Sequence, residues 1–152
     1  MSVRVAINGF GRIGRNVFRI LHSRQDEFEV VAVNDLTDSK TLAHLLKYDT
    51  VGGRFPGKVT AEEREISVDD KVIRVLGERD PAALPWEDLG VDFVVEATGI
   101  FRDKSSCSKH LEAGAQKVVL TVPPKGDVDA MIVLGVNDTI LEPTHRIISN
   151  AS

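Results

Sequence analysis

Apolar runs and stretches of helical periodicity alternate along most of the chain. Runs of apolar residues with little polar alternation are typical of strands buried on both faces of a parallel sheet. The runs that we interpret as strands are residues 3–7, 29–35, 92–99, 117–124, 130–136 and 145–152. Elsewhere apolar residues recur at intervals of three and four, which predicts helices over residues 11–23, 39–49 and 105–115. This alternation predicts a parallel sheet with helices on both faces.

The same periodicity predicts which residues of each helix face the sheet. In the helix at 11–23 the inward residues are Ile13, Val17, Ile20 and Leu21. In the helix at 39–49 the inward residues are Leu42, Leu45 and Leu46, and Ser39 is the candidate N-cap. In the helix at 105–115, Cys107 and Leu111 share one face and Gly114 lies at the C-terminal end.

Residues 54–81 follow a different pattern, because polar and apolar side chains alternate there. Alternation with a period of two is typical of strands with one solvated face. The pair Asp69-Asp70 divides the alternating stretch and has the composition of a turn. We therefore expect a β-hairpin on an exposed edge, added to the parallel sheet.

Glycines occupy three of the six positions from 9 to 14, directly between the first strand and the first helix. Gly9, Gly11 and Gly14 have the spacing of a dinucleotide-binding loop. In such a loop the first glycine permits a tight turn, the second lets a pyrophosphate approach the backbone, and the third lets helix and strand pack closely. The alternative is a turn that binds nothing and only allows this packing. With the loop read as a binding motif, the fold class is α/β, a Rossmann-type mostly parallel sheet with helices on both faces and the added hairpin.

Asp35 ends the second predicted strand, about twenty residues beyond the glycines. A carboxylate at this place accepts hydrogen bonds from ribose hydroxyls and repels a 2′-phosphate, which favours NAD over NADP. Two later strand ends also carry hydroxyl or glycine residues, Thr98 with Gly99 and then Thr121. Ligands bind beyond the carboxyl ends of parallel strands, so these residues are either ligand contacts or plain turn residues.

Composition narrows the choice of partner and compartment. A formal charge of −4 and a pI near 5.6 argue against a general binder of nucleic acids or anionic membranes. No apolar run is long enough for a transmembrane helix, and a strand begins at once, leaving no room for a leader peptide. The single cysteine rules out an internal disulfide framework, and the four histidines lack metal-ligand spacing. We expect a cytoplasmic protein without a metal site.

Several longer motifs carry a resemblance to a known family. They are INGFGRIGRN, VNDLTD, LAHLLKYDTVGGRF, GERDPAALPW, VVEATGIF, HLEAGAQKVVLTVPPK, IVLGVN and ISNAS, in this order. Together they resemble the N-terminal half of the phosphorylating glyceraldehyde-3-phosphate dehydrogenases, from the first strand to the last residue. The resemblance implies one NAD-binding domain over residues 1–152, with the catalytic domain absent from this chain.

The resemblance also implies roles for individual residues. Around the pyrophosphate of NAD it places Asn8, Gly9, Phe10, Gly11, Arg12, Ile13 and Gly14. Asn34 and Asp35 hold the adenosine ribose, and Arg79 lies beside the adenine. Thr98, Gly99 and Phe101 line the cleft, and Thr121 approaches the nicotinamide side. Two positions depart from the family pattern, Ala97 and Thr121-Val122-Pro123, where serine and Ser-Ala-Pro are frequent.

In this family a nucleophilic cysteine directly follows the motif that ends here at Ser152. The complete enzyme, a tetramer, uses NAD and inorganic phosphate to convert glyceraldehyde 3-phosphate to 1,3-bisphosphoglycerate, and Ser152 touches phosphate there. Because the nucleophile is missing, we expect this chain to bind NAD but not to catalyse. Cys107 does not replace it, since its helix position predicts a buried structural thiol. His44 and His110 are interpreted as surface or packing residues.

Two other functions remain open at this level. An erythrose-4-phosphate dehydrogenase shares NGFGRIGR and KYDT, although VNDLTD favours the glyceraldehyde enzyme. A stand-alone NAD-binding module is the alternative from a different class of protein. RNA binding by the nucleotide cleft has no basic patch to support it.

Overall fold

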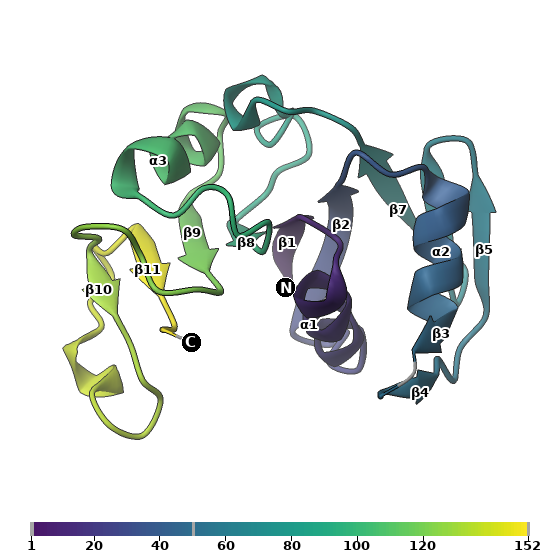
Figure 1. Ribbon diagram of the computed structural model, residues 1–152, viewed down its shortest axis with the longest axis horizontal. Coiled ribbons are helices and arrows are strands. Elements are labelled where there is room, and N and C mark those ends of the chain that lie inside the picture. The colour runs from purple at the N-terminus through teal and green to yellow at the C-terminus, as the bar shows by residue number, and fades with distance from the viewer. Residues whose placement is uncertain (1, 50, 152) are drawn as a thin grey trace.

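The computed structural model describes residues 2–49 and 51–151, and within them the strands form a nine-stranded sheet and a separate two-stranded one. Figure 1 shows the large sheet crossing the molecule. Its strands, in spatial order, are β10 (Ala130–Met131), β11 (Ile147–Ser149), β9 (Lys117–Leu120), β8 (Phe93–Glu96), β1 (Val3–Asn8), β2 (Phe28–Asn34), β7 (Lys71–Leu76), β6 (Glu65–Val68) and β5 (Val59–Glu62). The small sheet pairs β3 (Tyr48–Asp49) with β4 (Gly53–Arg54).

The large sheet is parallel from β10 to β7 and antiparallel from β7 to β5. The helices are α1 (Arg12–His22), α2 (Ser39–Lys47) and α3 (Lys104–Glu112), and short 3₁₀ turns cover Pro81–Ala83 and Asp138–Ile140. The predicted Rossmann-type sheet with an added hairpin is therefore confirmed. Among the described residues, the helices are all too short or too polar to cross a membrane.

The hairpin around Asp69 and Asp70 is confirmed, but its position needs correction. Both aspartates have positive φ, 50° and 68°, as the tight turns of two-residue hairpins require. The strand after this turn, β7, pairs in parallel with β2 and lies inside the sheet. The exposed edge is formed by β5, which the sequence pattern did not separate from β6.

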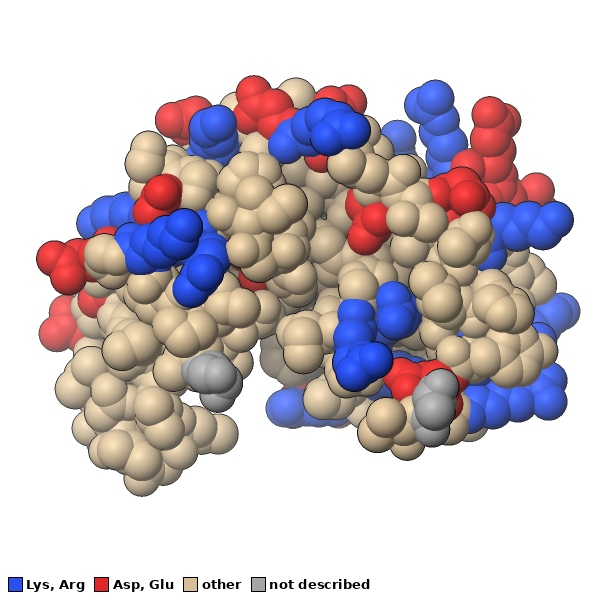
Figure 2. Space-filling view, in the orientation of Figure 1, with Lys and Arg blue, Asp and Glu red and all other residues tan. Residues whose placement is uncertain are grey.

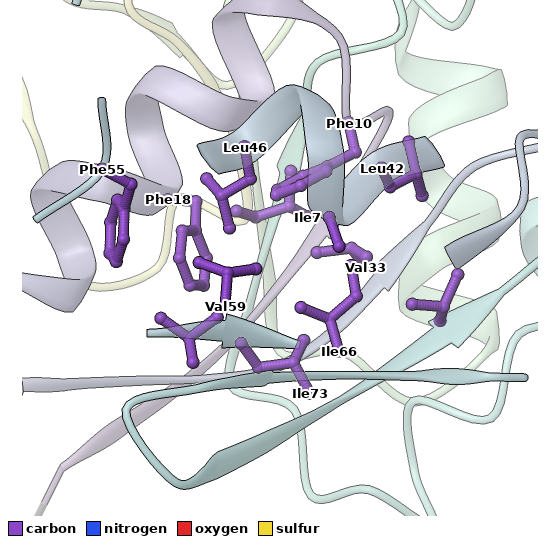
Figure 3. Close-up of a cluster of buried hydrophobic side chains, with 13 residues drawn as sticks. Ile7, Phe10, Phe18, Val33, Leu42, Leu46, Phe55, Val59, Ile66 and Ile73 are labelled. Atoms are coloured by element: carbon purple, nitrogen blue, oxygen red, sulfur yellow. The ribbon is translucent and has the colours of Figure 1, made fainter. Parts of the chain in front are cut away.

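Adjacent residues of β1 point to opposite faces of the sheet, and each joins a different core cluster. Ile7 packs with Phe10 of the following loop and with side chains from α1, α2 and β5 to β7, among them Phe18, Leu42, Leu46 and Ile73 (Figure 3). Ala6 packs on the other face with Trp86, Leu84, Val91, Val94 and Ala115. A third cluster, below α3, contains Cys107, Val118, Leu120 and Ile147. Helices thus cover both faces, as the sequence predicts.

The predicted inward face of α1 was wrong at two positions. Ile13 and Ile20 are 50% and 59% exposed, whereas Gly14 and Phe18 are buried. The helix is rotated because Gly14 lies against the carbonyl of Gly9, where a side chain would collide with the backbone. Because of this contact, Phe18 faces the sheet, whereas Ile13 and Ile20 face away from it.

Smaller corrections concern α2 and the last strands. Leu45 is exposed, and the N-cap is Asp38, whose side chain accepts from the Thr41 N–H at 2.8 Å. Ser39 is buried instead and donates to the carbonyls of β5 and its turn. The strand predicted over 130–136 ends at Met131, since the chain turns through Gly135 at a φ of +83°.

Candidate functional site

The carboxyl ends of β1, β2 and β8 meet at a cleft of about 460 Å³. This volume lies within the range of roughly 300–1,000 Å³ that is typical of small-molecule sites. The described residues that line it are Asn8, Gly9, Gly11, Asn34, Asp35, Leu36, Glu78, Arg79, Ala97, Thr98, Ile100 and Phe101. Such a position, beyond the ends of central parallel strands, is where ligands bind in open α/β sheets.

The three glycines of the loop differ in their surroundings. Gly9 has a φ of +92°, and a Cβ there would lie 2.8 Å from the Thr98 nitrogen. Gly14 has no room for a side chain because the Gly9 carbonyl fills that space. Gly11 faces open space, with no heavy atom within 4 Å of a Cβ placed on it. Packing therefore accounts for Gly9 and Gly14 but leaves Gly11 unexplained.

The N-terminus of α1 begins at this open position. Its N-cap is Gly11, no side chain of the described residues caps it, and its first turn holds no acidic residue. The first N–H groups of an α-helix have no partner within the helix, and they carry the positive end of its dipole. Arg12 and Ile13, in this first turn, are exposed. The geometry fits a bound anion such as a pyrophosphate.

Asp35 joins the glycine loop to the end of β2. Its Oδ2 accepts from the Phe10 N–H at 2.8 Å, and its Oδ1 accepts from the Thr37 N–H at 3.0 Å. An ionised carboxylate has about four acceptor positions, so both oxygens keep capacity for a ligand hydroxyl. Phe10 itself is buried in the core and reaches this site through its backbone.

Asn34 is buried beside Asp35, and its amide is bonded to protein atoms. It donates to Asn8 Oδ1 at 2.8 Å and to the Glu78 carbonyl at 2.9 Å, and it accepts from the Glu78 N–H at 2.9 Å. These bonds hold the backbone of Glu78, which lines the cleft together with Arg79. Asp35 and Glu78 are the two acidic residues among the described lining residues.

Most of the site residues named from the sequence lie in or directly beside the cleft. The lining includes Asn8, Gly9, Gly11, Asn34, Asp35, Arg79, Thr98 and Phe101. Phe10, Arg12, Ile13, Gly14, Gly99 and Thr121 are not among the described lining residues, and the hydroxyl of Thr121 donates to the Glu96 carbonyl at 3.2 Å. Ser152 lies outside the described residues.

The sequence reasoning missed four lining residues, Leu36, Glu78, Ala97 and Ile100. Each is adjacent in sequence to a residue that it named. The residues of a turn that follows a strand lie together at the cleft. Extending each motif by one residue would therefore have included these four lining residues.

The remaining reactive side chains of the sequence lie outside the cleft. Cys107 lies on the buried face of α3, and this burial, together with the negative charges of Glu96 and Asp103, raises the pKa of its thiol to about 12. His44 is exposed and packs against Tyr48. His110 is fully buried. These positions agree with the prediction of a buried thiol at Cys107 and of surface or packing residues at His44 and His110.

Comparison with known proteins decides the family. Residues 3–104 match the family described as glyceraldehyde 3-phosphate dehydrogenase, NAD binding domain. The chain belongs to this family. The cofactor that the sequence predicts, NAD, is the one that this dehydrogenase domain binds, and the resemblance seen in the motifs is confirmed.

Individual dehydrogenases of this name are similar along nearly the whole chain. Glyceraldehyde-3-phosphate dehydrogenase of Thermotoga maritima is 59% identical over 150 residues, which are 98% of this chain and 45% of the relative. Glyceraldehyde-3-phosphate dehydrogenase 1 of Streptomyces arenae is 58% identical over 153 residues, and the plasmid enzyme of Cupriavidus necator is 51% identical over 154. The chain therefore spans about half the length of these relatives.

Proposed function

We propose that this chain is the cofactor-binding half of a phosphorylating glyceraldehyde-3-phosphate dehydrogenase. In the complete protein the reaction oxidises glyceraldehyde 3-phosphate with NAD and inorganic phosphate and yields 1,3-bisphosphoglycerate. The observation that carries the proposal is the uncapped N-terminus of α1, which opens beside Gly11 into the cleft at the strand ends. The names of the similar dehydrogenases support the choice of substrate.

The residues of the cleft have complementary roles in this proposal. The backbone from Asn8 to Gly14 holds the pyrophosphate, with Arg12 and Ile13 nearest to it. Asp35 binds the adenosine ribose, while Asn34 fixes the position of Arg79 next to the adenine. Thr98 and Phe101 also line the cleft, Gly99 lies between them in the turn after β8, and Thr121 lies on the nicotinamide side. The second carboxylate, Glu78, adds to the discrimination against a 2′-phosphate.

Bound NAD supplies the acceptor for the hydride that leaves the aldehyde carbon. The residues of this domain hold and orient it, and they exclude water from its adenosine half. The nucleophile that attacks the aldehyde belongs to the catalytic domain, and Cys107, buried and with a pKa of about 12, does not take its place. The 152-residue chain alone is therefore inactive, and Ser152 contacts phosphate only in the complete enzyme.

An exposed apolar segment supports the proposal of a further domain and a tetrameric complete protein. The segment that follows β10 exposes Val133, Leu134, Val136, Ile140 and Leu141. In Figure 2 charged side chains of both signs are scattered over the visible face, whereas the lobe at the lower left, where this segment lies in Figure 1, shows no charged side chain from this side. Apolar patches of this kind mark surfaces that other protein covers. We assign the protein to the cytoplasm, where its substrates are used.

Calorimetric titration of the 152-residue chain with NAD and with NADP tests the proposal. We expect NAD to bind and NADP to bind at least about tenfold more weakly, since Asp35 is proposed to face the 2′ position and Glu78 adds a second acidic residue to the cleft lining. Glyceraldehyde 3-phosphate with phosphate and NAD should give no NADH. Equal affinity for the two cofactors, or steady NADH production by the chain alone, would contradict it.

A further inference from the structure

A fully buried carboxylate lies directly behind the cleft. Glu96, the last residue of β8, is 1% exposed. Its Oε1 accepts from Asn8 Nδ2 at 2.6 Å and from His110 Nε2 at 2.8 Å. Its Oε2 accepts from the N–H and the hydroxyl of Thr98, at 3.0 and 2.6 Å. Four donors thus satisfy both oxygens, which is the arrangement that a buried ionised carboxylate needs.

The direction of these hydrogen bonds is fixed from the far side of the sheet. The indole N–H of Trp86, which can only donate, lies 3.0 Å from His110 Nδ1. His110 Nδ1 must therefore accept, so that the proton of the neutral ring is on Nε2 and is donated to Glu96. Trp86 and His110 are both fully buried, and nothing from solvent competes with this chain of bonds.

The network continues from Glu96 to both walls of the cleft. On one wall the Thr98 hydroxyl, while donating to Glu96, accepts from the Ile100 N–H at 3.1 Å and so shapes the turn after β8. Toward the other wall, Asn8 donates to Glu96 and accepts from Asn34 at 2.8 Å. Asn34 in turn holds the backbone of Glu78, next to Arg79.

We propose that Glu96 is a positioning residue for NAD: its buried charge, oriented through His110 by Trp86, sets the distance between the two walls of the cofactor cleft. The proposal rests on NAD binding in this cleft, as proposed above. A negative acceptor is required at position 96 because every group that faces it is a donor. Charge-assisted hydrogen bonds are about twice as strong as neutral ones, which suits them to holding flexible turns.

The variant Glu96→Gln tests this requirement with little change in shape. Whichever way its amide turns, the NH₂ group faces a fixed N–H, either that of Thr98 or that of His110, and at least one bond is lost. We expect the Kd of NAD to rise roughly tenfold in calorimetry on the folded variant. Asp129→Asn is the matched control, because Asp129 is a half-buried carboxylate that accepts from backbone N–H groups far from the cleft. Its Kd should stay within about twofold of wild type.

A second variant keeps the proposal testable if Glu96→Gln does not fold. Trp86→Phe keeps most of the aromatic volume and removes the donor that orients His110, so the Kd of NAD should rise about threefold.

Trp86 is the only tryptophan of the sequence, and its indole N–H gives one NMR signal. It is not among the described lining residues, yet we expect NAD to shift this signal in the wild type.

The outcomes separate the two proposals. If the wild type binds NAD while the folded variants bind it as tightly and the indole signal does not move, the positioning role is refuted and NAD binding stands. If the wild type does not bind NAD, both proposals fail. A weaker Kd in Glu96→Gln or Trp86→Phe, with the Asp129→Asn control unchanged, supports the role of Glu96.

Discussion

The backbone N–H of Phe10 donates a 2.8 Å hydrogen bond to Oδ2 of Asp35, so that the glycine loop and the end of β2 are held together by the carboxylate proposed to bind ribose. One residue thereby has two tasks. It fixes the loop that is proposed to face the pyrophosphate, and in the same proposal it presents a negative charge to the 2′ position of the ribose. Removing the charge should affect both tasks.

For Asp35→Asn we expect the affinity for NAD to fall roughly tenfold, because an amide keeps only one acceptor for the Phe10 N–H, the Thr37 N–H and the ribose. The affinity for NADP should change less, because the repulsion of its 2′-phosphate is relieved at the same time. Calorimetric titration with both cofactors measures the ratio of the NAD affinity to the NADP affinity.

Asp38→Asn is the control for this change of charge. Asp38 caps α2 three residues away and is not among the described residues that line the cleft, and asparagine caps helices about as well as aspartate. Its NAD-to-NADP ratio should match the wild type. If Asp35→Asn also keeps the wild-type ratio, Asp35 does not select the cofactor.

Gly11→Ala and Gly14→Ala should separate binding from folding. Gly11 has an ordinary negative φ and open space around it, so alanine should change the free energy of unfolding by less than about 1 kcal/mol. Its methyl group nevertheless occupies the place proposed for the pyrophosphate, and NAD binding should weaken more than about tenfold. Urea denaturation and NAD titration on the same sample measure both effects.

In Gly14→Ala the methyl group collides with the Gly9 carbonyl, which is backbone and cannot turn away. We expect a loss of about 3 kcal/mol or more in the free energy of unfolding, larger than the usual cost of overpacking. A stable Gly14→Ala protein, or tight NAD binding by Gly11→Ala, would show that the loop does not approach its ligand as described.

The features that the sequence predicted well are those with local causes. The glycine loop, Asp35 and the Asp69-Asp70 turn each owe their structure to neighbouring residues, so a short motif was enough to recognise them. The face of α1 was not predicted, because periodicity weighs Ile13 and Ile20 by their hydrophobicity. The contact of Gly14 with a carbonyl five residues earlier, which decides the rotation of the helix, carries no hydrophobic signal.

The network behind the cleft was beyond the reach of the motifs. Glu96 is 88 residues from Asn8, and Trp86 is 24 residues from His110. A carboxylate at the end of an apolar strand looks like a solvated strand end until the donors that surround it are brought together by the fold. The sequence left His110 as either a surface or a packing residue, and it gave no sign that the ring contacts a buried carboxylate.

Cys107 should resist alkylation in the folded chain. Burial raises the pKa of its thiol to about 12, so at pH 8 only roughly one molecule in ten thousand is a thiolate, and the sulfur is also covered. We expect iodoacetamide to react with the chain in urea but not in buffer. Because Cys107 is the only cysteine, any label observed by mass spectrometry reports on it. Rapid labelling in buffer would show that α3 opens readily or that the thiol is not buried.

Asp129 should make the stability of the chain depend on pH in the acid range. Burial acts to raise the pKa of its carboxyl group, but the N–H groups of Ile147 and Arg146 and the ammonium group of Lys104 outweigh it and lower the pKa to about 2. A carboxylate whose folded pKa lies below its unfolded value stabilises the fold above the unfolded value, near 3.9, and this contribution is lost as the pH falls toward the folded value.

We therefore expect Asp129→Asn to lower the free energy of unfolding by about 1 kcal/mol at pH 7, since the amide still accepts from the backbone but loses its charge. The difference from wild type should narrow between about pH 4 and pH 2, where the wild-type carboxylate takes up its proton. Lys104→Gln removes only the ion pair between Lys104 and Asp129. It should lower the free energy of unfolding by less than about 0.5 kcal/mol, because Lys104 is largely solvated. Urea denaturation at a series of pH values measures these differences. A gap in the free energy of unfolding between wild type and Asp129→Asn that stays constant down to pH 2 would show that the charge of Asp129 does not account for the stabilisation.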